Sequence, residues 1–234
     1  MENTTIIFLI ATLIVVIPTI RLILCYKNYK NSNYYKATSN SFLSVFWNSG
    51  RYGEYSLYRH LQPFELSNCK FLFNLYVPRE NGKTSEIDLI MFHPKGLFVI
   101  ESKNYSGWIF GNEKNKQWTQ TLPIGYGESH KERFYNPIMQ NSTHIRAIRR
   151  YIDSSIPVYS VIAFSDKCTL KDVTVNSNVI VTYYSDLQKE IQFKLSENNS
   201  YTMTPELLNE TYSKLSQYAN VDNYTKIQHI HNNR

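Results

Sequence analysis

The apolar residues of this chain form one long N-terminal run, followed by shorter segments with helix or strand periodicity. From Thr4 to Ile20 there are 17 uncharged residues, most of them β-branched or leucine, and LILC follows Arg21. About 20 apolar residues span the hydrocarbon core of a bilayer, and an arginine near the end can extend its charge to the headgroups. The run predicts a transmembrane helix that contacts the lipid bilayer through residues 4–25.

A cleaved signal peptide is the alternative interpretation of the same run. Signal peptides have a positive first region and small residues before the cleavage site. Here Glu2 is the charged side chain before the run, and IRLILCYK has no small-x-small pattern. An uncleaved anchor is therefore favoured. Because basic residues follow the span, the positive-inside rule predicts the N-terminus outside and the body of the chain in the cytoplasm.

The remaining chain alternates between helix and strand periods. Leu57 and Leu61 lie four residues apart, as on one face of a helix, and Asn81-Gly82 is a strong signal for a hairpin turn. Residues 104–135 are expected to be less regular. The predicted strands are residues 69–77, 85–92, 97–103, 158–164 and 179–183, and the predicted helices are residues 49–62, 136–153 and 204–218. This order predicts an α/β fold with a mixed sheet flanked by helices.

Composition and charge change this picture little. The net charge is +6, of which residues 1–50 carry +3 (four basic, one acidic) and the remainder +3 (21 basic, 18 acidic). The body is only mildly basic, which permits nucleic-acid binding without indicating it. Cys25, Cys69 and Cys168 lack metal-ligand spacing, so neither a disulfide framework nor a zinc site is expected.

The candidate chemistry lies in three charged residues on the predicted strands. Glu101 and Lys103 are two residues apart and share a strand face, while a four-residue turn brings the strand of Asp88 alongside. Neighbouring carboxylates repel unless a cation intervenes, and Mg²⁺ accepts a few carboxylates together with water and phosphate oxygens. A nearby lysine can offset charge that develops on phosphorus. The set predicts a Mg²⁺- or Mn²⁺-dependent phosphodiester hydrolase with Asp88 and Glu101 as metal ligands.

Each of these residues also has a simpler interpretation. Glu101 and Lys103 would contribute about 0–1 kcal/mol as an exposed ion pair on an edge strand. Asp88 could end a strand, although the apolar run LFVI before Glu101 favours a central strand. Other polar candidates are histidines that could act as a second base or be structural, and arginines that could follow phosphates or face solvent: His130, His144, Arg146, Arg149 and Arg150.

Asp88 followed by Glu101-Ser102-Lys103 resembles the signature of the PD-(D/E)xK nucleases, which have the restriction-endonuclease-like fold. More narrowly, the chain is similar to the nuclease-related domain family, NERD, from about Arg51 to Phe164. The stretches that carry the resemblance are Gly53-Glu54, Glu86-Ile87-Asp88, Val99 to Asn104, Gly107 with Trp118, and Asn136-Pro137-Ile138-Met139-Gln140.

The resemblance implies a restriction-endonuclease-like mixed sheet and a Mg²⁺-dependent nuclease. It implies that Asp88 and Glu101 bind the metal and that Lys103 is the catalytic lysine. It also implies an auxiliary acid, Glu54, from the first helix of the body, and a polar residue, Gln140, directed at the site from the second. Ser102 departs from the usual apolar residue or threonine, and its side chain is expected to point away from the site.

The expected organisation is an anchor at 1–26, a juxtamembrane linker at 27–45, a NERD nuclease-like domain at 46–165, a C-terminal strand and helix completing the domain at 166–220, and a loose tail at 221–234. The expected function is a membrane-anchored, Mg²⁺-dependent nuclease, with DNA favoured over RNA as the nucleic-acid partner. An RNA-directed enzyme would use the same residues. The alternative is a catalytically inactive module that docks nucleic acid or protein at the membrane.

Overall fold

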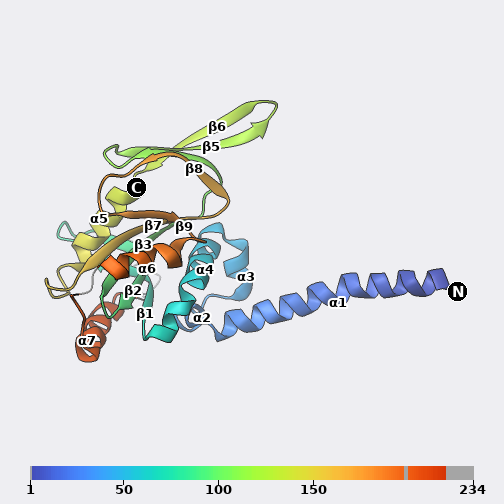
Figure 1. The fold of residues 1–234 in the computed structure, drawn as a ribbon, viewed down its shortest axis with the longest axis horizontal. Coiled ribbons are helices and arrows are strands. Elements are labelled where there is room, and N and C mark those ends of the chain that lie inside the picture. The colour runs from blue at the N-terminus through green and yellow to red at the C-terminus, as the bar shows by residue number, and fades with distance from the viewer. Residues whose placement is uncertain (1, 198–199, 220–234) are drawn as a thin grey trace.

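The computed structural model of this 234-residue chain describes residues 2–197 and 200–219. The expected tail at 221–234 lies outside the described residues. Helix α1 (Glu2–Asn31) projects from the body as a single rod (Figure 1). In the described part of the chain, one segment, Thr12–Asn31, is long and apolar enough to cross a membrane. This is a test of length and composition, which a signal sequence near the N-terminus also meets.

The end of α1 and the residues after it are folded onto the body. Helices α2 (Asn33–Thr38) and α3 (Phe42–Trp47) lead into α4 (Ser49–Leu61) and the short 3-10 helix η1 (Gln62–Ser67). Tyr29, Tyr34 and Val45 are fully buried. The Tyr34 ring meets Phe73 edge to face, with centroids 5.2 Å apart. The stretch expected as a linker therefore contributes aromatic side chains to the core.

The central sheet contains five strands in the order β1-β2-β3-β7-β9. Strands β1 (Lys70–Pro78), β2 (Thr84–His93) and β3 (Gly96–Lys103) are antiparallel neighbours, and β7 (Val158–Phe164) and β9 (Ile180–Tyr183) continue in parallel from β3. The strands are rich in β-branched and aromatic residues, which pack well on a pleated surface. The inner strands are covered on both faces along continuous apolar runs, which are LIMF in β2, LFVI in β3 and VIAF in β7.

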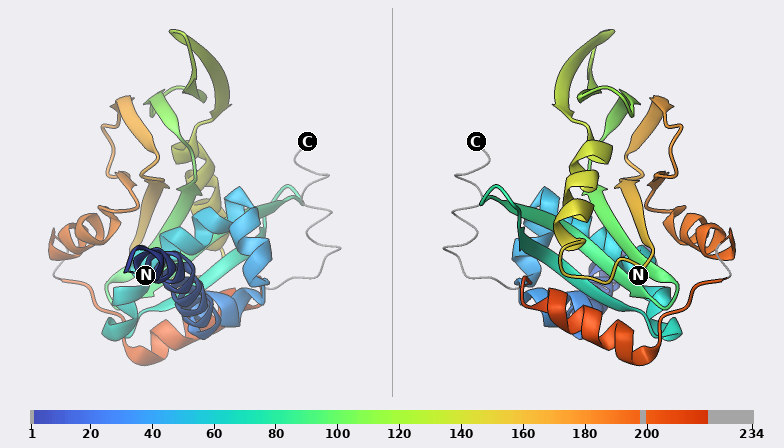
Figure 2. Two further views of the ribbon diagram at one scale, coloured as in Figure 1. Left: turned by 90° about the vertical axis from the view of Figure 1, so that its right-hand side faces the viewer. Right: turned by 90° about the vertical axis from the view of Figure 1, so that its left-hand side faces the viewer.

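Helices cover both faces of this sheet. On one face, Leu57 and Leu61 of α4 and Leu187 of α6 (Leu187–Glu197) pack against Phe98 and Ile100 of β3. On the other face, α5 (Pro137–Ile148) and α7 (Pro205–Ser216) close a second apolar cluster around Val99 and Ile90. Figure 2 shows the helices arranged around the central strands from two sides.

A second sheet has the order β6-β5-β4-β8. Its strands are β4 (Gly107–Asn112), β5 (Gln117–Gly125), β6 (Glu128–Tyr135) and β8 (Cys168–Thr174), so most of the less regular stretch 104–135 is strand. Trp118 is 1% exposed and lies parallel to Phe164. The hairpin of β5 and β6 extends away from the body (Figures 1 and 2). The expected mixed α/β architecture is confirmed, with two mixed sheets flanked by helices and an apolar N-terminal helix.

Candidate functional site

The site begins where the ladder between β2 and β3 ends. Leu89 pairs with Ile100, so one further step of the register brings Asp88 opposite Glu101. At this step the carboxylate replaces backbone pairing, because Asp88 Oδ2 accepts a 2.8 Å hydrogen bond from the Ser102 amide. The Ser102 hydroxyl points to the other face, where it lies 2.7 Å from the Tyr184 hydroxyl. The acidic residues of the two strands are therefore neighbours at one end of the hairpin.

Lys103 contacts both Glu101 and Gln140. Lys103 Nζ donates to Glu101 Oε1 at 2.7 Å and to Gln140 Oε1 at 3.1 Å. Glu101 is 2% exposed and the Lys103 side chain 14%. A lysine and a glutamate two residues apart on an exposed edge strand would not be enclosed in this way. The interpretation as a surface ion pair therefore does not describe this site.

A histidine completes the surroundings of Glu101. His144 Nε2 lies 3.1 Å from Glu101 Oε2, and its Nδ1 lies 2.9 Å from the Ser85 hydroxyl. Because an ionised carboxylate only accepts hydrogen bonds, His144 Nε2 is the donor in the contact with Glu101. Both oxygens of Glu101 thus have a donor, one from β3 and one from α5.

These contacts shift the ionisation of the buried pair. Burial alone would raise the pKa of Glu101, but the Lys103 ammonium and His144 outweigh it and lower that pKa below its usual value. Burial likewise opposes the charged form of Lys103, yet the carboxylates of Glu101 and Asp88 raise the Lys103 pKa. Both members of the pair are therefore charged at neutral pH.

Asp88 has the opposite tendency. Its pKa is raised well above the usual range, first by burial and then by the negative charges of Glu101 and Glu54. Lys103 and the Ser102 amide lower the pKa of Asp88, but they do not compensate. Asp88 thus has more negative charge around it than the nearby cation offsets.

Glu54 lies at a separate depression. It comes from α4 and accepts hydrogen bonds from Asn74 Nδ2 at 2.9 Å and from the Tyr34 hydroxyl at 3.1 Å. Burial raises the pKa of Glu54, the two hydrogen bonds lower it, and the charge of Glu86 raises it further. Glu54 lines a small pocket with Asn74 and Glu86, and not the cleft beside Asp88. Its influence on Asp88 is electrostatic.

A cleft of about 490 Å³ opens beside Asp88. Asp88, Gln140 and His144 line its wall. Gln140 contacts Lys103 and His144 contacts Glu101, so Lys103 and Glu101 lie behind this wall. The remaining lining residues are Arg79, Thr84, Ser85, Glu86, Tyr135 and Thr143. A polymer that enters the cleft can therefore reach Asp88.

The residues can be compared with the needs of a divalent cation. Within residues 2–197 and 200–219, no three His, Cys, Asp or Glu side chains are grouped closely enough to hold a metal ion by themselves. Mg²⁺ commonly uses one or two carboxylates and completes its shell with water and substrate phosphate. Asp88 and Glu101 match that requirement in donor type and in number. The raised pKa of Asp88 is also the effect that a nearby cation would reverse.

Two asparagines position α5 over the site. Asn136 caps the helix by accepting from the Ile138 amide, and its Nδ2 donates to the carbonyls of Glu113 and Asn115. Asn141 Nδ2 donates to the carbonyl of Val99 on β3 at 2.8 Å, which fixes the helix to the strand that carries Glu101. No sequence pattern marks Asn141 or Ser85 as part of the site. The i, i+4 spacing of Gln140 and His144 was the available signal that both face the sheet.

We predict that His144→Ala lowers stability through Glu101. Removing the imidazole leaves one oxygen of a buried carboxylate without its donor, at a cost of about 1–3 kcal/mol at pH 7. A carboxylate with a depressed pKa stabilises the fold above its unfolded pKa of about 4.3 and loses this effect as pH falls. The difference from wild type should therefore shrink toward pH 3 in urea unfolding.

The matched control is His130→Ala. His130 also contacts a glutamate, Glu132, at 3.2 Å, but both side chains are 58% exposed on β6. This control should change the unfolding free energy by no more than about 0.5 kcal/mol. Equal effects of the two substitutions would mean that His144 does not support Glu101.

Comparison with known proteins matches the part of the chain that holds the candidate site. The family model described as a nuclease-related domain, NERD, matches residues 49–165, a range that holds Glu54, Asp88, Glu101, Lys103 and Gln140. An uncharacterized protein of Bacillus anthracis is 42% identical over 144 residues, which are 61% of this chain and 66% of that protein, slightly under two thirds of its length. No solved structure matches the chain. Since the family model covers half of the sequence, this chain belongs to the nuclease-related domain family, which is part of the restriction-endonuclease-like nuclease superfamily.

Proposed function

We propose that this chain hydrolyses phosphodiester bonds in nucleic acid, with DNA as the preferred substrate and Mg²⁺ or Mn²⁺ as cofactor. The observation that carries the proposal is the contact of Lys103 with Glu101 and Gln140, directly behind a cleft whose wall holds Asp88. A docking module has no physical need for this combination, because carboxylates beside a phosphate backbone repel it.

Each residue has a separate role in this proposal. Asp88 and Glu101 would hold the divalent ion, which when bound supplies an acidified water and neutralises negative charge on the phosphate. The Lys103 ammonium would offset the charge that develops as the attacking oxygen adds. Gln140 and His144 would position Lys103 and Glu101, as their hydrogen bonds indicate. Glu54 would act at a distance, through its effect on the ionisation of Asp88.

The test is hydrolysis of labelled duplex DNA, single-stranded DNA and RNA by the detergent-solubilised chain, with Mg²⁺ or with EDTA. Cleavage should require the metal and should be lost in Glu101→Gln, which has nearly the same shape without the charge. The three substrates distinguish a DNA enzyme from an RNA enzyme. Equal cleavage by wild type and Glu101→Gln would remove the proposed site.

A catalytically inactive docking module remains the alternative, and one observation favours it. Both oxygens of Glu101 already accept hydrogen bonds, from Lys103 and His144, so a metal ion would have to share these oxygens with two donors. A docking module should bind nucleic acid or protein equally well with and without Mg²⁺, and Glu101→Gln should leave that binding unchanged. Metal-dependent cleavage would exclude this alternative.

We also propose that α1 anchors the chain in a membrane with the body in the cytoplasm. The apolar side chains of its described part, Leu13 to Leu24, are largely exposed to solvent, as expected of a lipid-facing helix. Helix α3 packs beside α1, where Tyr26 and Phe42 meet edge to face. It exposes Leu43 and Trp47, and tryptophan is enriched where a protein meets the headgroup region.

We predict that the chain stays in the membrane pellet after carbonate washing. Replacing both Leu13 and Ile17 by arginine should release it, because each central arginine costs roughly 2.5–3.5 kcal/mol of insertion. Replacing the exposed Lys171 and Lys189 by arginine is the control and should leave the chain in the pellet. A shorter mature chain, found by mass spectrometry, would show cleavage at a signal sequence and contradict anchoring.

A further inference from the structure

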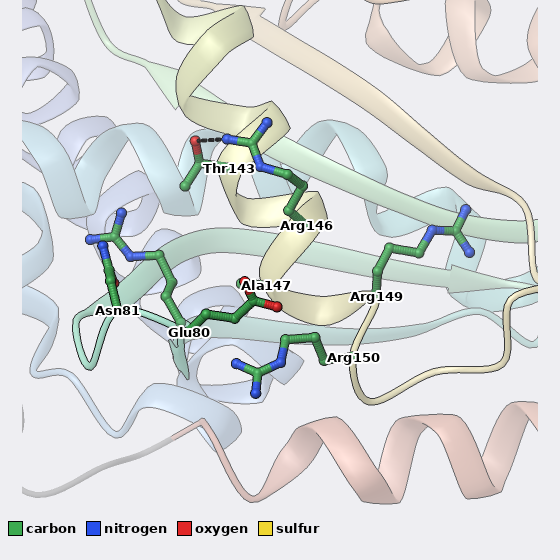
Figure 3. Close-up of a pocket in the computed structure, with 8 residues that line it drawn as sticks. Glu80, Asn81, Thr143, Arg146, Ala147, Arg149 and Arg150 are labelled. Atoms are coloured by element: carbon green, nitrogen blue, oxygen red, sulfur yellow. Dashed lines mark hydrogen bonds between the residues drawn. The ribbon is translucent and has the colours of Figure 1, made fainter.

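A second groove joins the cleft of the candidate site. It has a volume of about 530 Å³ and shares Arg79 and Thr143 with that cleft. Figure 3 shows it between the β1–β2 turn and the C-terminal end of α5. We call it the arginine groove; its lining residues are Arg79, Glu80, Asn81, Thr143, Arg146, Ala147, Arg149 and Arg150. Because the two hollows share a wall, a chain molecule lying in one can continue into the other.

The charge of the groove is strongly positive. Its lining holds four arginines and a single carboxylate, that of Glu80. In the described ranges, Arg146 and Arg150 take part in no salt bridge. Positive charges that line one groove repel one another, and a polyanion relieves that repulsion. The body as a whole is only mildly basic, so the concentration of arginine here is a local feature.

The arginines differ in what they can bind. Arg149 donates from Nη1 to the Ile156 carbonyl at 2.7 Å and points away from the groove in Figure 3, so it supports the turn after α5. Arg146 donates to the Ser142 and Thr143 hydroxyls at 3.2 and 2.9 Å, which orients its guanidinium while leaving further N–H donors. Arg150 is exposed, and its guanidinium lies 6.0 Å from the Tyr151 ring. Arg146 and Arg150 therefore have guanidinium N–H groups that can receive an anion.

We infer that Arg146 and Arg150 bind backbone phosphates of the nucleic acid on one side of the bond that Asp88 faces. The inference rests on the proposed function and extends it by assigning the direction in which the substrate leaves the cleft. Guanidinium groups bind phosphate through paired hydrogen bonds, and such contacts carry no sequence information. The chain should therefore bind nucleic acid without sequence preference through this groove.

Two simpler interpretations are separated by a binding experiment. Arginines in the last turn of a helix also complement its dipole, and exposed arginines often only face solvent. Neither role contributes to the salt dependence of nucleic-acid binding. Each phosphate contact, in contrast, releases counterions and adds about 0.9 to the slope of log K against log salt for duplex DNA.

The experiment uses the full chain in detergent, in the Asp88→Asn background and in EDTA, with labelled DNA of mixed sequence. Anisotropy titrations between 50 and 300 mM salt give the slope of log K against log salt for the Asp88→Asn chain. The same slope is measured after Arg146→Gln and Arg150→Gln are added to that chain. The slope should fall by about 1.8 for duplex DNA or about 1.4 for single strands. The control pair, Arg59→Gln and Lys189→Gln, removes the same charge from α4 and α6 on the opposite face and should leave the slope unchanged.

Glu80 provides a change in the opposite direction. Glu80→Gln removes the carboxylate that lines the groove and should strengthen binding roughly two- to fivefold at 100 mM salt, because a like charge beside the phosphates is lost.

Equal salt slopes for the Arg146 and Arg150 variant and for the control pair would overturn the inference. So would loss of binding to phosphatidylglycerol vesicles with DNA binding unchanged, which would assign the groove to lipid headgroups. Hydrolysis is not read in this experiment, so the groove and the catalytic proposal can fail separately.

Discussion

Asp88→Asn is expected to yield a chain that is both more stable than wild type at pH 7 and unable to hydrolyse nucleic acid. Asparagine keeps an oxygen that can accept from the Ser102 amide, as Asp88 Oδ2 does at 2.8 Å. It removes a negative charge that Glu101 and Glu54 oppose. The expected gain is about 1–3 kcal/mol, since an incompletely paired buried charge costs stability.

The pH dependence of this gain has a defined sign. The pKa of Asp88 is higher in the folded chain than its unfolded value of about 3.9. Below about pH 3.9 the group is protonated in both states, so wild type and variant should differ little. As pH rises toward the folded pKa, the folded state binds more protons than the unfolded state, and wild type loses stability relative to the variant. Above the folded pKa the difference no longer changes with pH.

Activity and metal binding should change in the other direction. Loss of a metal ligand removes several kcal/mol of transition-state stabilisation, so hydrolysis should fall by at least about 10³-fold. Mg²⁺ should raise the melting temperature of wild type and have no such effect on the variant. Asp172→Asn, an exposed substitution on β8, is the control for both readouts. A variant that is less stable at pH 7, or that still cleaves, would contradict the assignment of Asp88.

The strands that carry the site could be predicted from the sequence because their pattern is local. The strands 85–92 and 97–103 match β2 and β3 to within one residue at each end, since apolar runs and the four-residue turn determine the hairpin. The second sheet could not be predicted in the same way. The sequence of β6, ESHKERFY, has no alternation of apolar residues, and its pairing with β5 is seen only in three dimensions.

The contacts within the site were predictable in part. The spacing of Glu101 and Lys103 indicates a shared face, and their contact follows from it. The place of His144 depends on how α5 lies across β3, which Asn141 fixes through a carbonyl that carries no sequence signal. Tyr34 reaches Glu54 from a stretch whose polar composition is typical of linkers. Long-range packing, and not residue type, determines these two contacts.

Lys103→Met is expected to have the second large effect, on stability and activity together. The substitution removes the donor to Glu101 Oε1 and leaves a carboxylate that is 2% exposed with His144 as its remaining partner. Breaking a buried pair from one side costs about 3–5 kcal/mol. Hydrolysis by the molecules that remain folded should fall by about 10²–10³-fold, because a positioned positive charge is lost.

Lys103→Arg separates the two effects. Arginine keeps the positive charge beside Glu101, so most of the lost stability should return. Its planar guanidinium is larger than the ammonium group and cannot occupy the same point, so hydrolysis should remain at least about 10²-fold below wild type. A chain in which Lys103 only neutralises Glu101 would regain both stability and activity with arginine.

The control for this pair is another lysine–glutamate contact in the same chain. Lys194 Nζ lies 2.9 Å from Glu197 on α6, with side chains 22% and 48% exposed. Because solvent screens this pair, Lys194→Met should cost no more than about 1 kcal/mol and leave hydrolysis unchanged. The two lysines make ion pairs of similar length, so burial accounts for any difference in stability, and the neighbouring Asp88 and Gln140 account for any difference in rate. If Lys194→Met and Lys103→Met had equally small effects on stability and on hydrolysis, the contact of Lys103 with Glu101 would be an ordinary ion pair. The proposed role of Lys103 in hydrolysis would then be wrong.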